Sequence, residues 1–118
     1  MSIKTIAVML DWVEANLEAN PELTKLAAYV GYSSFYCSAK FREYVGISFR
    51  EYVLKRKLSL AAAELMKTDD RILEIAVRYG FSSHEAFTRA FKRAYGCAPD
   101  QYRRAKPEVP LFEKICVM

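Results

Sequence analysis

An internal repeat constrains this chain more than any other feature of its sequence. The stretch LAAYVGYSSFYCSAKFREYVGISFREYVLKRK, which starts at Leu26, recurs as IAVRYGFSSHEAFTRAFKRAYGCAPDQYRRAK, which starts at Ile75. Glycines recur 49 positions apart, as Gly31 and Gly80 do, and after one inserted residue aromatic side chains recur 50 positions apart. Such self-similarity is the signature of a repeated supersecondary unit. We therefore predict two copies of one small unit.

Each copy has the pattern of two helices joined by a tight turn. In the first copy, an apolar periodic stretch over 24–30 predicts a helix that ends at Gly31, because glycine readily takes the left-handed conformation of a C-cap. Ser33 is predicted to cap the next helix, over 34–45. The predicted core stripe of that helix is Cys37, Phe41, Tyr44 and Val45. The three residues between these two helices are typical of the turn in a helix-turn-helix unit.

The second copy repeats this pattern with its own caps. Asp69 or Asp70 is predicted to cap a helix that ends at Gly80. Ser82, together with the glutamate three residues later, predicts a capping box for a helix over 83–95. The predicted core stripe of this helix is Phe87, Phe91 and Ala94.

Three further helices frame the two units. Residues 4–19 carry apolar side chains at helical spacing, namely Ile6, Leu10, Val13 and Leu17. A capping box that begins at Ser48 opens a long helix over 49–67. Its predicted core residues are Tyr52, Leu58, Ala61, Ala62, Leu65 and Met66. Pro99 suits the first turn of a last helix that runs through Arg104.

These elements predict an all-α fold. The four glycines and four prolines leave few places for turns, so a many-stranded fold is excluded. We expect about seven helices, arranged as two helix-turn-helix subdomains joined by a long central helix. The subdomains span residues 1–47 and 68–106, and the linker helix spans 48–67. Residues 107–118 are expected to be a tail or the start of a further domain.

Composition excludes several classes of protein. A chain of 118 residues can bury a core without a metal or a disulfide. Apolar runs such as Ile6 to Leu10 are far shorter than the roughly 20 residues that span a bilayer, so we expect no membrane contact. Three cysteines without a C-x-x-C pair predict neither a disulfide framework nor a zinc site, and we expect a cytoplasmic protein without a cofactor. Cys37 and Cys97 are interpreted as small buried apolar residues.

The net charge of +4 is unevenly distributed along the chain. Residues 31–56 carry +3 and residues 80–106 carry +4, whereas residues 57–79 are neutral. Two basic blocks on either side of a neutral one indicate a polyanion that is contacted in two places.

A set of motifs spans both copies. The first copy contains L-A-x3-G-Y-S from Leu26 and F-x4-G-x5-Y from Phe41. The second contains I-A-x3-G-F-S-S from Ile75, F-x-R-x-F from Phe87 and G-x2-P-x2-Y-R from Gly96. Together these motifs resemble the DNA-binding region of the AraC/XylS family of bacterial transcription regulators.

The resemblance covers roughly residues 5–106 and implies a function. It implies that one helix of each subdomain enters one of two successive major grooves of double-stranded promoter DNA. The chain looks like the small stand-alone members, which act as monomers on asymmetric sites, and we expect RNA polymerase as a second partner. A 19-residue central helix is about 28 Å long, near the roughly 34 Å between successive major-groove faces.

Positions opposite each core stripe face outward and are the candidate DNA contacts. In the first copy these are Ser34, Phe35, Tyr36, Ser38, Ala39, Lys40 and Arg42. In the second copy they are Ser83, His84, Glu85, Thr88, Arg89, Lys92 and Arg93, joined by Arg103 and Arg104 from the last helix.

The chemistry of these side chains separates base contacts from phosphate contacts. Arg89 can donate two hydrogen bonds to guanine, Thr88 can touch a thymine methyl, and Glu85 can accept from cytosine. The other cations suit phosphate contacts, which position the protein without reading sequence: Lys40, Arg42, Lys92, Arg93, Arg103 and Arg104.

Several of these residues have a plainer interpretation. His84 is also typical of a solvated first-turn residue, and Phe35 of a side chain that staples a helix entry. Arg103 and Arg104 are also typical of cations near a helix C-terminus. Tyr52 and Tyr102 are interpreted as core residues.

The two copies differ at the matched pair Ala39 and Arg89, which lie 50 positions apart. The family commonly carries arginine at the first of these places too. The first reading helix therefore lacks its obvious guanine contact. We expect sequence specificity to lie mainly in the second subdomain.

Two other function classes compete with DNA reading. The alternative is a helical protein-interaction module that contacts the transcription machinery and binds DNA only weakly. An enzyme is not expected, because the chain has a single histidine and no recognisable set of nucleophile, base and oxyanion donors.

Overall fold

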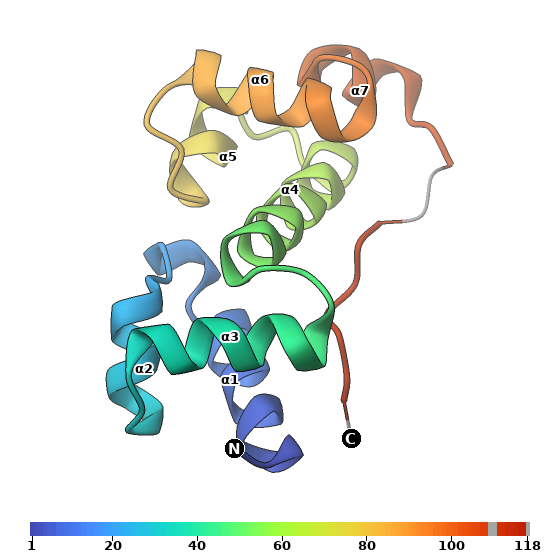
Figure 1. The fold of residues 1–118 in the computed structure, drawn as a ribbon. Helices are drawn as coiled ribbons and strands as arrows, with labels where there is room; N and C mark the ends of the chain where they lie inside the picture. Colours follow the sequence, from blue (N-terminus) through green and yellow to red (C-terminus); the bar gives the residue numbers. More distant parts are fainter. Residues whose placement is uncertain (109–110, 118) are drawn as a thin grey trace. The chain divides into compact units, whose positions relative to one another are not determined.

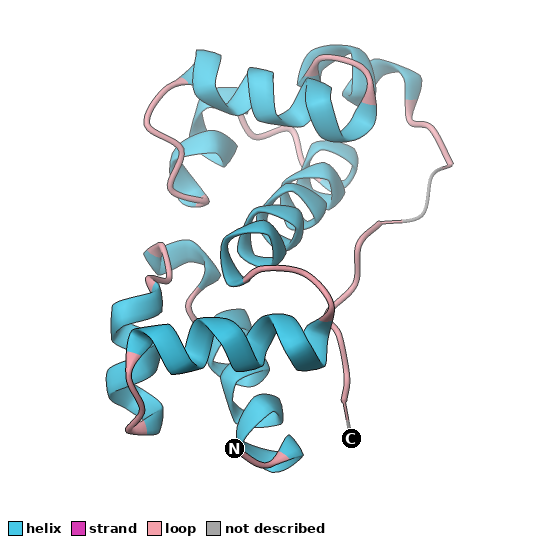
Figure 2. Ribbon diagram, viewed as in Figure 1, coloured by secondary structure: helices cyan, strands magenta, loops and turns pink. Residues whose placement is uncertain are grey.

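The computed structural model describes residues 1–108 and 111–117, and every regular element in these ranges is helical (Figures 1 and 2). In chain order the elements are α1 (Ile3–Ala15), the 3-10 turn η1 (Leu17–Ala19), α2 (Leu23–Val30), α3 (Ser34–Val45), α4 (Phe49–Lys67), α5 (Ile72–Arg78), α6 (His84–Tyr95) and α7 (Pro99–Ala105). The all-α prediction is confirmed. None of the helices in the described ranges is both long enough and apolar enough to cross a membrane.

The chain folds as two compact units. The first unit holds residues 1–54 together with a segment that begins at Lys114, and the second holds Lys55–Glu113. The boundary therefore falls within α4, the long helix that joins the two copies of the repeat.

The first unit is built around the predicted stripe of α1. Ile6, Leu10 and Val13 are buried, as is Leu17 in the turn that follows. Helices α2 and α3 pack against α1 and against each other. Phe41 of α3 lies edge-on to two aromatic rings of α4, those of Phe49 and Tyr52, with ring centroids 5.6 Å apart in each pair.

The second unit repeats this core with its own aromatic side chains. Phe91 of α6 lies edge-on to Tyr102 of α7 at 5.2 Å and beside Phe87 at 5.6 Å. The buried cluster continues along the second half of α4 through Leu58, Ala61, Ala62 and Leu65, as the sequence predicts. Met66 packs against this cluster and is only half-buried.

Helices α3 and α6 begin at equivalent serines. Ser33 Oγ accepts the Tyr36 N–H at 3.1 Å, as predicted, and Ser83 Oγ accepts the Ala86 N–H at 3.0 Å. The prediction of Ser82 as the cap of α6 is wrong. The extra residue of the second copy lies in its turn, so the chain reaches the helix one residue later than in the first copy.

The helix before this turn also begins differently from the prediction. Neither Asp69 nor Asp70 caps α5, which starts after Arg71 and has no side-chain cap. The carboxylate of Asp70 instead accepts a hydrogen bond from Arg78. A partner that lies eight residues away in the chain outweighs the local capping contact.

The core stripes predicted for α3 and α6 are correct at the centre of each helix and wrong near its C-terminal end. Cys37 and Phe41 are buried, but Tyr44 is 39% exposed. In α6, Ala94 is exposed, and the half-buried Tyr95 lies 4.7 Å from the ring of Phe91 instead. The reason is helical phase, because the side chain four positions after each phenylalanine lies below it on the same face.

Candidate nucleic-acid interface

The outward face of α3 combines an exposed aromatic ring with small side chains and carries little charge. Phe35, the second residue of the helix, is 86% exposed. Ser38, Ala39 and Arg42 continue this exposed face, and Ser34, Tyr36 and Lys40 border it half-buried, as the sequence predicts. A phenylalanine this exposed has no packing role, so the interpretation of Phe35 as a staple of the helix entry is wrong.

One edge of this face is a column of three side chains. The rings of Tyr32 and Tyr36 lie 5.2 Å apart, and Lys40 Nζ lies 5.7 Å from the centre of the Tyr36 ring. Lys40 Nζ also donates to Glu43 Oε2 at 3.0 Å, and this hydrogen bond is the main cause that raises the pKa of Lys40. Glu43 was not foreseen as part of the site. The three-residue spacing from Lys40 is the signal that could have found it.

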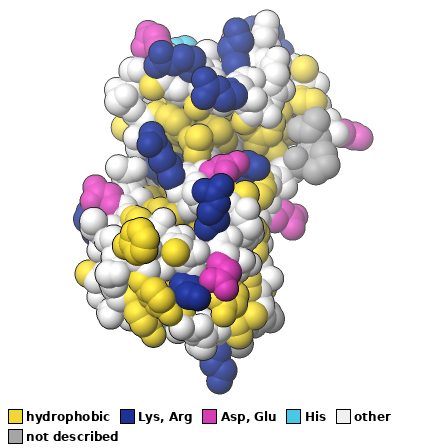
Figure 3. Space-filling model, viewed as in Figure 1, with side chains coloured by type: hydrophobic (Ala, Val, Ile, Leu, Met, Phe, Trp, Pro, Cys, Tyr) yellow, Lys and Arg dark blue, Asp and Glu magenta, His cyan; other side chains and the backbone are white. Residues whose placement is uncertain are grey.

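The outward face of α6 carries a different chemistry. His84, Glu85, Arg89, Lys92 and Arg93 are all exposed, and Ser83 is half-buried at the cap. Figure 3 shows dark-blue side chains gathered over α6, whereas yellow patches lie over α2 and α3. The second unit thus presents hydrogen-bonding and cationic groups where the first presents aromatic ones.

Thr88 lies on the border of the α6 face. Its side chain is half-buried, and its hydroxyl is shielded from solvent without a hydrogen-bond partner. The predicted outward position therefore holds only in part, because the hydroxyl points into the protein.

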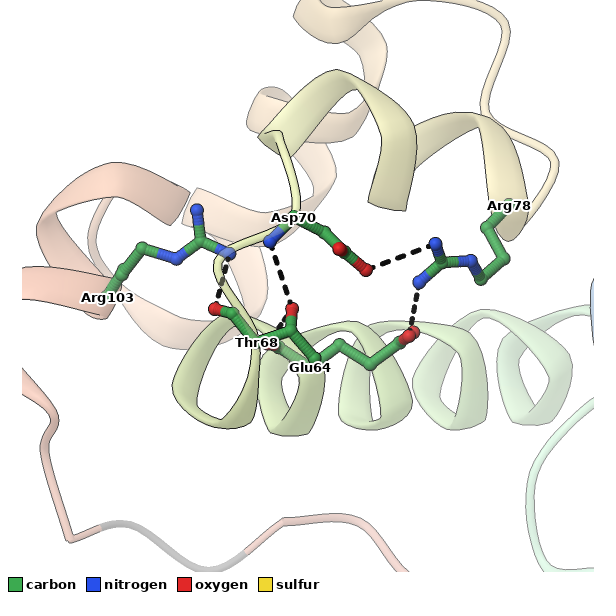
Figure 4. Close-up of polar contacts among 5 residues, drawn as sticks. All are labelled: Glu64, Thr68, Asp70, Arg78 and Arg103. Atoms are coloured by element: carbon green, nitrogen blue, oxygen red, sulfur yellow. Dashed lines mark hydrogen bonds and ion pairs between the residues drawn. The ribbon is translucent and has the colours of Figure 1, made fainter.

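The two predicted phosphate contacts of α7 have different surroundings. Arg103 Nε donates to the carbonyl of Leu65 at 2.9 Å. Its Nη2 donates to the carbonyl of Thr68 at 3.2 Å, a contact that Figure 4 shows. Its guanidinium therefore binds one carbonyl in the last turn of α4 and one just after it, so these two N–H groups are not free for a phosphate. Arg104 is exposed and pairs with Asp100 at 3.3 Å, one turn earlier on the same helix.

A second arginine secures α5, the helix before the α6 turn. Arg78 donates to Glu64 of α4 and, at 3.2 Å, to Asp70 of the α4–α5 connection (Figure 4). These carboxylates raise the pKa of Arg78, with the hydrogen bond to Asp70 as the main cause. The Asp70 N–H donates to Thr68 Oγ1 at 3.3 Å. The ion pairs therefore hold α5 to the end of α4. Sequence patterns did not reveal them, because Arg78 and Glu64 lie 14 positions apart.

The described part of the chain contains no group of three or more histidine, cysteine or carboxylate side chains that could hold a metal ion. The exposed groups of α3 and α6 are of the kinds that contact bases and phosphates: an aromatic ring, hydroxyls, a carboxylate and cations.

Known proteins share both the sequence and the fold of this chain. The profile of a family described as "Helix-turn-helix domain" matches residues 26–105. The multiple antibiotic resistance protein MarA of Escherichia coli (strain K12) is 37% identical over 99 residues, which are 84% of this chain and 78% of MarA. The transcriptional activator AarP of Providencia stuartii is 35% identical over 98 residues, which are 83% of this chain and 73% of AarP.

Two solved structures have a similar fold. The DNA-binding domain of the global transcriptional factor AdpA, in complex with a target DNA, superposes with a TM-score of 0.80 at 27% identity, over 85% of this chain and 90% of that domain. An AraC-type regulator from Chromobacterium violaceum superposes with a TM-score of 0.82 at 25% identity, over 91% of this chain and 96% of that one.

Proposed function

This chain belongs to the AraC/XylS family of sequence-specific, DNA-binding transcription regulators, and we propose that it reads promoter DNA with the exposed faces of α3 and α6. Each helix would enter a major groove with its serine-capped end. The observation that carries this proposal is the pair of matched faces, each on a helix whose inward side is buried and whose outward side is unpacked.

In the second unit, three exposed side chains suit base edges. Arg89 can donate two hydrogen bonds to guanine O6 and N7, and Glu85 can accept from cytosine N4. His84, in the first turn of α6, can reach a base or a phosphate. The neighbouring Lys92 and Arg93 would contact phosphates and set the register of the helix on the duplex.

In the first unit, Phe35 is the side chain best suited to a base. Its exposed ring can pack against the C5-methyl of thymine, which only the major groove presents. Ala39 would keep the middle of α3 close to the groove floor, with Ser38 beside it as an adaptable hydroxyl. Arg42, Lys40 and Tyr36 would contact the phosphates along the edges.

Selection of bound sequences from a random DNA pool tests the proposal. We expect one asymmetric site with a guanine under Arg89 and a thymine under Phe35. Replacing that thymine by deoxyuridine removes only the methyl group, so it should weaken binding by the wild type and leave binding by Phe35→Ala unchanged. The same replacement at a thymine outside both halves of the site is the control. A pool without any enriched sequence would refute sequence-specific reading.

The partners beyond DNA form part of the same proposal. A bacterial promoter regulator of this kind would act in the cytoplasm, as a monomer on its asymmetric site, without an enzymatic step. RNA polymerase is the protein partner that we propose. Support comes from α5, where Leu73 and Val77 lie exposed one turn apart and offer an apolar surface that the DNA-reading faces do not use.

The same exposed pair favours one alternative function, a protein-interaction module with weak DNA binding. Binding to the selected site and to random DNA at equal salt separates the two. A salt-sensitive preference for the selected site supports the regulator, and equal binding to both supports the module.

A further inference from the structure

The segment that follows α7 returns to the first unit and binds the start of α4. The Ile115 N–H donates to Tyr52 Oη at 3.1 Å. Tyr52 is fully buried, and its ring is part of the aromatic core around Phe41. A backbone group from residues 114–117 therefore satisfies a hydroxyl at the centre of the first unit.

The same segment also binds α1. Lys114 Nζ lies 2.8 Å from Asp11 Oδ1, and this hydrogen bond is the main cause that raises the pKa of Lys114. Residues 114–117 form one wall of a cleft of about 200 Å³, and Ala7, Leu10 and Asp11 of α1 form the other. Four consecutive residues thus bind two helices that are distant in the chain.

These contacts are weaker than those of the surrounding core. The described segment 111–117 has no helix, so it lacks the ladder of backbone hydrogen bonds that holds a helix together. Lys114, Ile115 and Val117 are only half-buried, and Asp11 is exposed. By contrast, Ile6, Leu10 and Val13 of α1 are buried. Segments with few buried contacts open locally at a lower free energy than the core beneath them.

The second unit provides a natural comparison. Tyr102 is the counterpart of Tyr52, 50 positions later, and its ring is likewise edge-on to a core phenylalanine. Its hydroxyl is buried and has no hydrogen-bond partner. The contact to the hydroxyl is therefore a feature of the first unit and not a requirement of the repeated core.

We propose that residues 114–117 form a releasable strap, which fastens α1 to the start of α4 and opens while the rest of the first unit stays folded. Because α1 packs against both α2 and α3, the strap controls how firmly the scaffold beneath the α3 face is held. A segment that follows the second unit in the chain thereby belongs to the packing of the first unit.

Amide hydrogen exchange on the full chain tests the strap. In the wild type, the Ile115 amide should be protected, yet it should exchange faster than the core amide of Val13. Tyr52→Phe keeps the ring and removes the acceptor, so it should speed Ile115 exchange about three- to tenfold. Tyr102→Phe is the matched control and should leave Ile115 exchange unchanged.

A second variant covers the case in which Tyr52→Phe perturbs the core. Lys114→Met removes the ion pair to Asp11 without touching a buried residue, and it should speed Ile115 exchange by about two- to fivefold while Val13 stays protected. The proposal of a strap is overturned if the Ile115 amide is unprotected in the wild type, or if it exchanges as slowly as the Val13 amide. It is also overturned if neither variant speeds Ile115 more than Tyr102→Phe does. None of these readouts involves DNA, so they stand apart from the proposed function.

Discussion

Phe41 of the first unit and Phe91 of the second occupy the same place in two copies of one core. Each lies edge-on to the matching tyrosine, with centroids 5.6 Å apart in the first unit and 5.2 Å apart in the second. On the opposite side of the same helices the two units diverge, because Ala39 faces outward where Arg89 does in the second copy. The inner faces are constrained by packing, whereas the outer faces are free to acquire different binding chemistry.

A position beside the core shows the same divergence. Arg78 of the second unit makes ion pairs with Glu64 and Asp70. Its counterpart 49 positions earlier is Tyr29, whose ring centroid lies 6.4 Å from that of Trp12 in α1. One unit therefore uses charge where the other uses an aromatic contact, while the helices around them keep the same order.

The strongest test of the shared core is to remove its matched phenylalanines. Phe41→Ala and Phe91→Ala should each lower the free energy of unfolding by about 3–5 kcal/mol, because each leaves a cavity at a fully buried site. Urea unfolding of both variants measures the loss. A loss below about 1 kcal/mol at either site would break the equivalence of the two cores.

The next test exchanges the side chains at one matched position of the two outward faces. Arg89→Ala should lose about 1–3 kcal/mol of binding free energy at the selected site and relax the preference at one guanine. Ala39→Arg should create a new guanine preference in the half of the site bound by the first unit. Competition binding on single-base variants of the site measures both effects.

Ser38→Ala is the control for this pair and should change binding much less, since a lone hydroxyl can serve several bases. If Arg89→Ala binds the selected site like the wild type, α6 does not read it. If Ala39→Arg gains no base preference, α3 does not enter its groove.

The ion pairs of the second unit provide a smaller test. Arg78→Met should lower the free energy of unfolding, because the partly buried carboxylate of Glu64 loses its ion-pair partner. Tyr29→Met at the matched position should cost less, since Tyr29 is mostly exposed. Chemical denaturation measures the free energy of unfolding of both variants. Equal losses would contradict the inference that ion pairs stabilise the second unit where an aromatic contact serves the first.

The smallest expected effect concerns phosphate contacts. Lys92→Ala and Arg42→Ala should each weaken binding to all DNA sequences alike and reduce the slope of log K against log salt by about 0.9. Titrations at several salt concentrations measure this slope. Arg103→Gln, which removes the charge, should leave the slope unchanged, because Arg103 donates to the carbonyls of Leu65 and Thr68. A slope reduced by Arg103→Gln would show that the Arg103 guanidinium contacts a phosphate.

The amino-acid sequence by itself determined the number of units, the order of the helices and the central residues of each buried face. The bounds predicted for the long helix, 49–67, agree with α4, and the stripe of α1 is buried as predicted. These features depend on helical periodicity, on glycine and serine at helix ends, and on the repeat. All are properties of neighbouring residues, so a single sequence displays them.

Tertiary structure alone decided the features that depend on partners far along the chain. Arg103 binds the carbonyl of Leu65, 38 residues earlier, and Ile115 binds Tyr52, 63 residues earlier. Asp70 forms an ion pair instead of a cap because folding brings Arg78 within reach. A charged or polar side chain suits several partners equally in the unfolded chain. Only the packing of the helices selects which of them it meets.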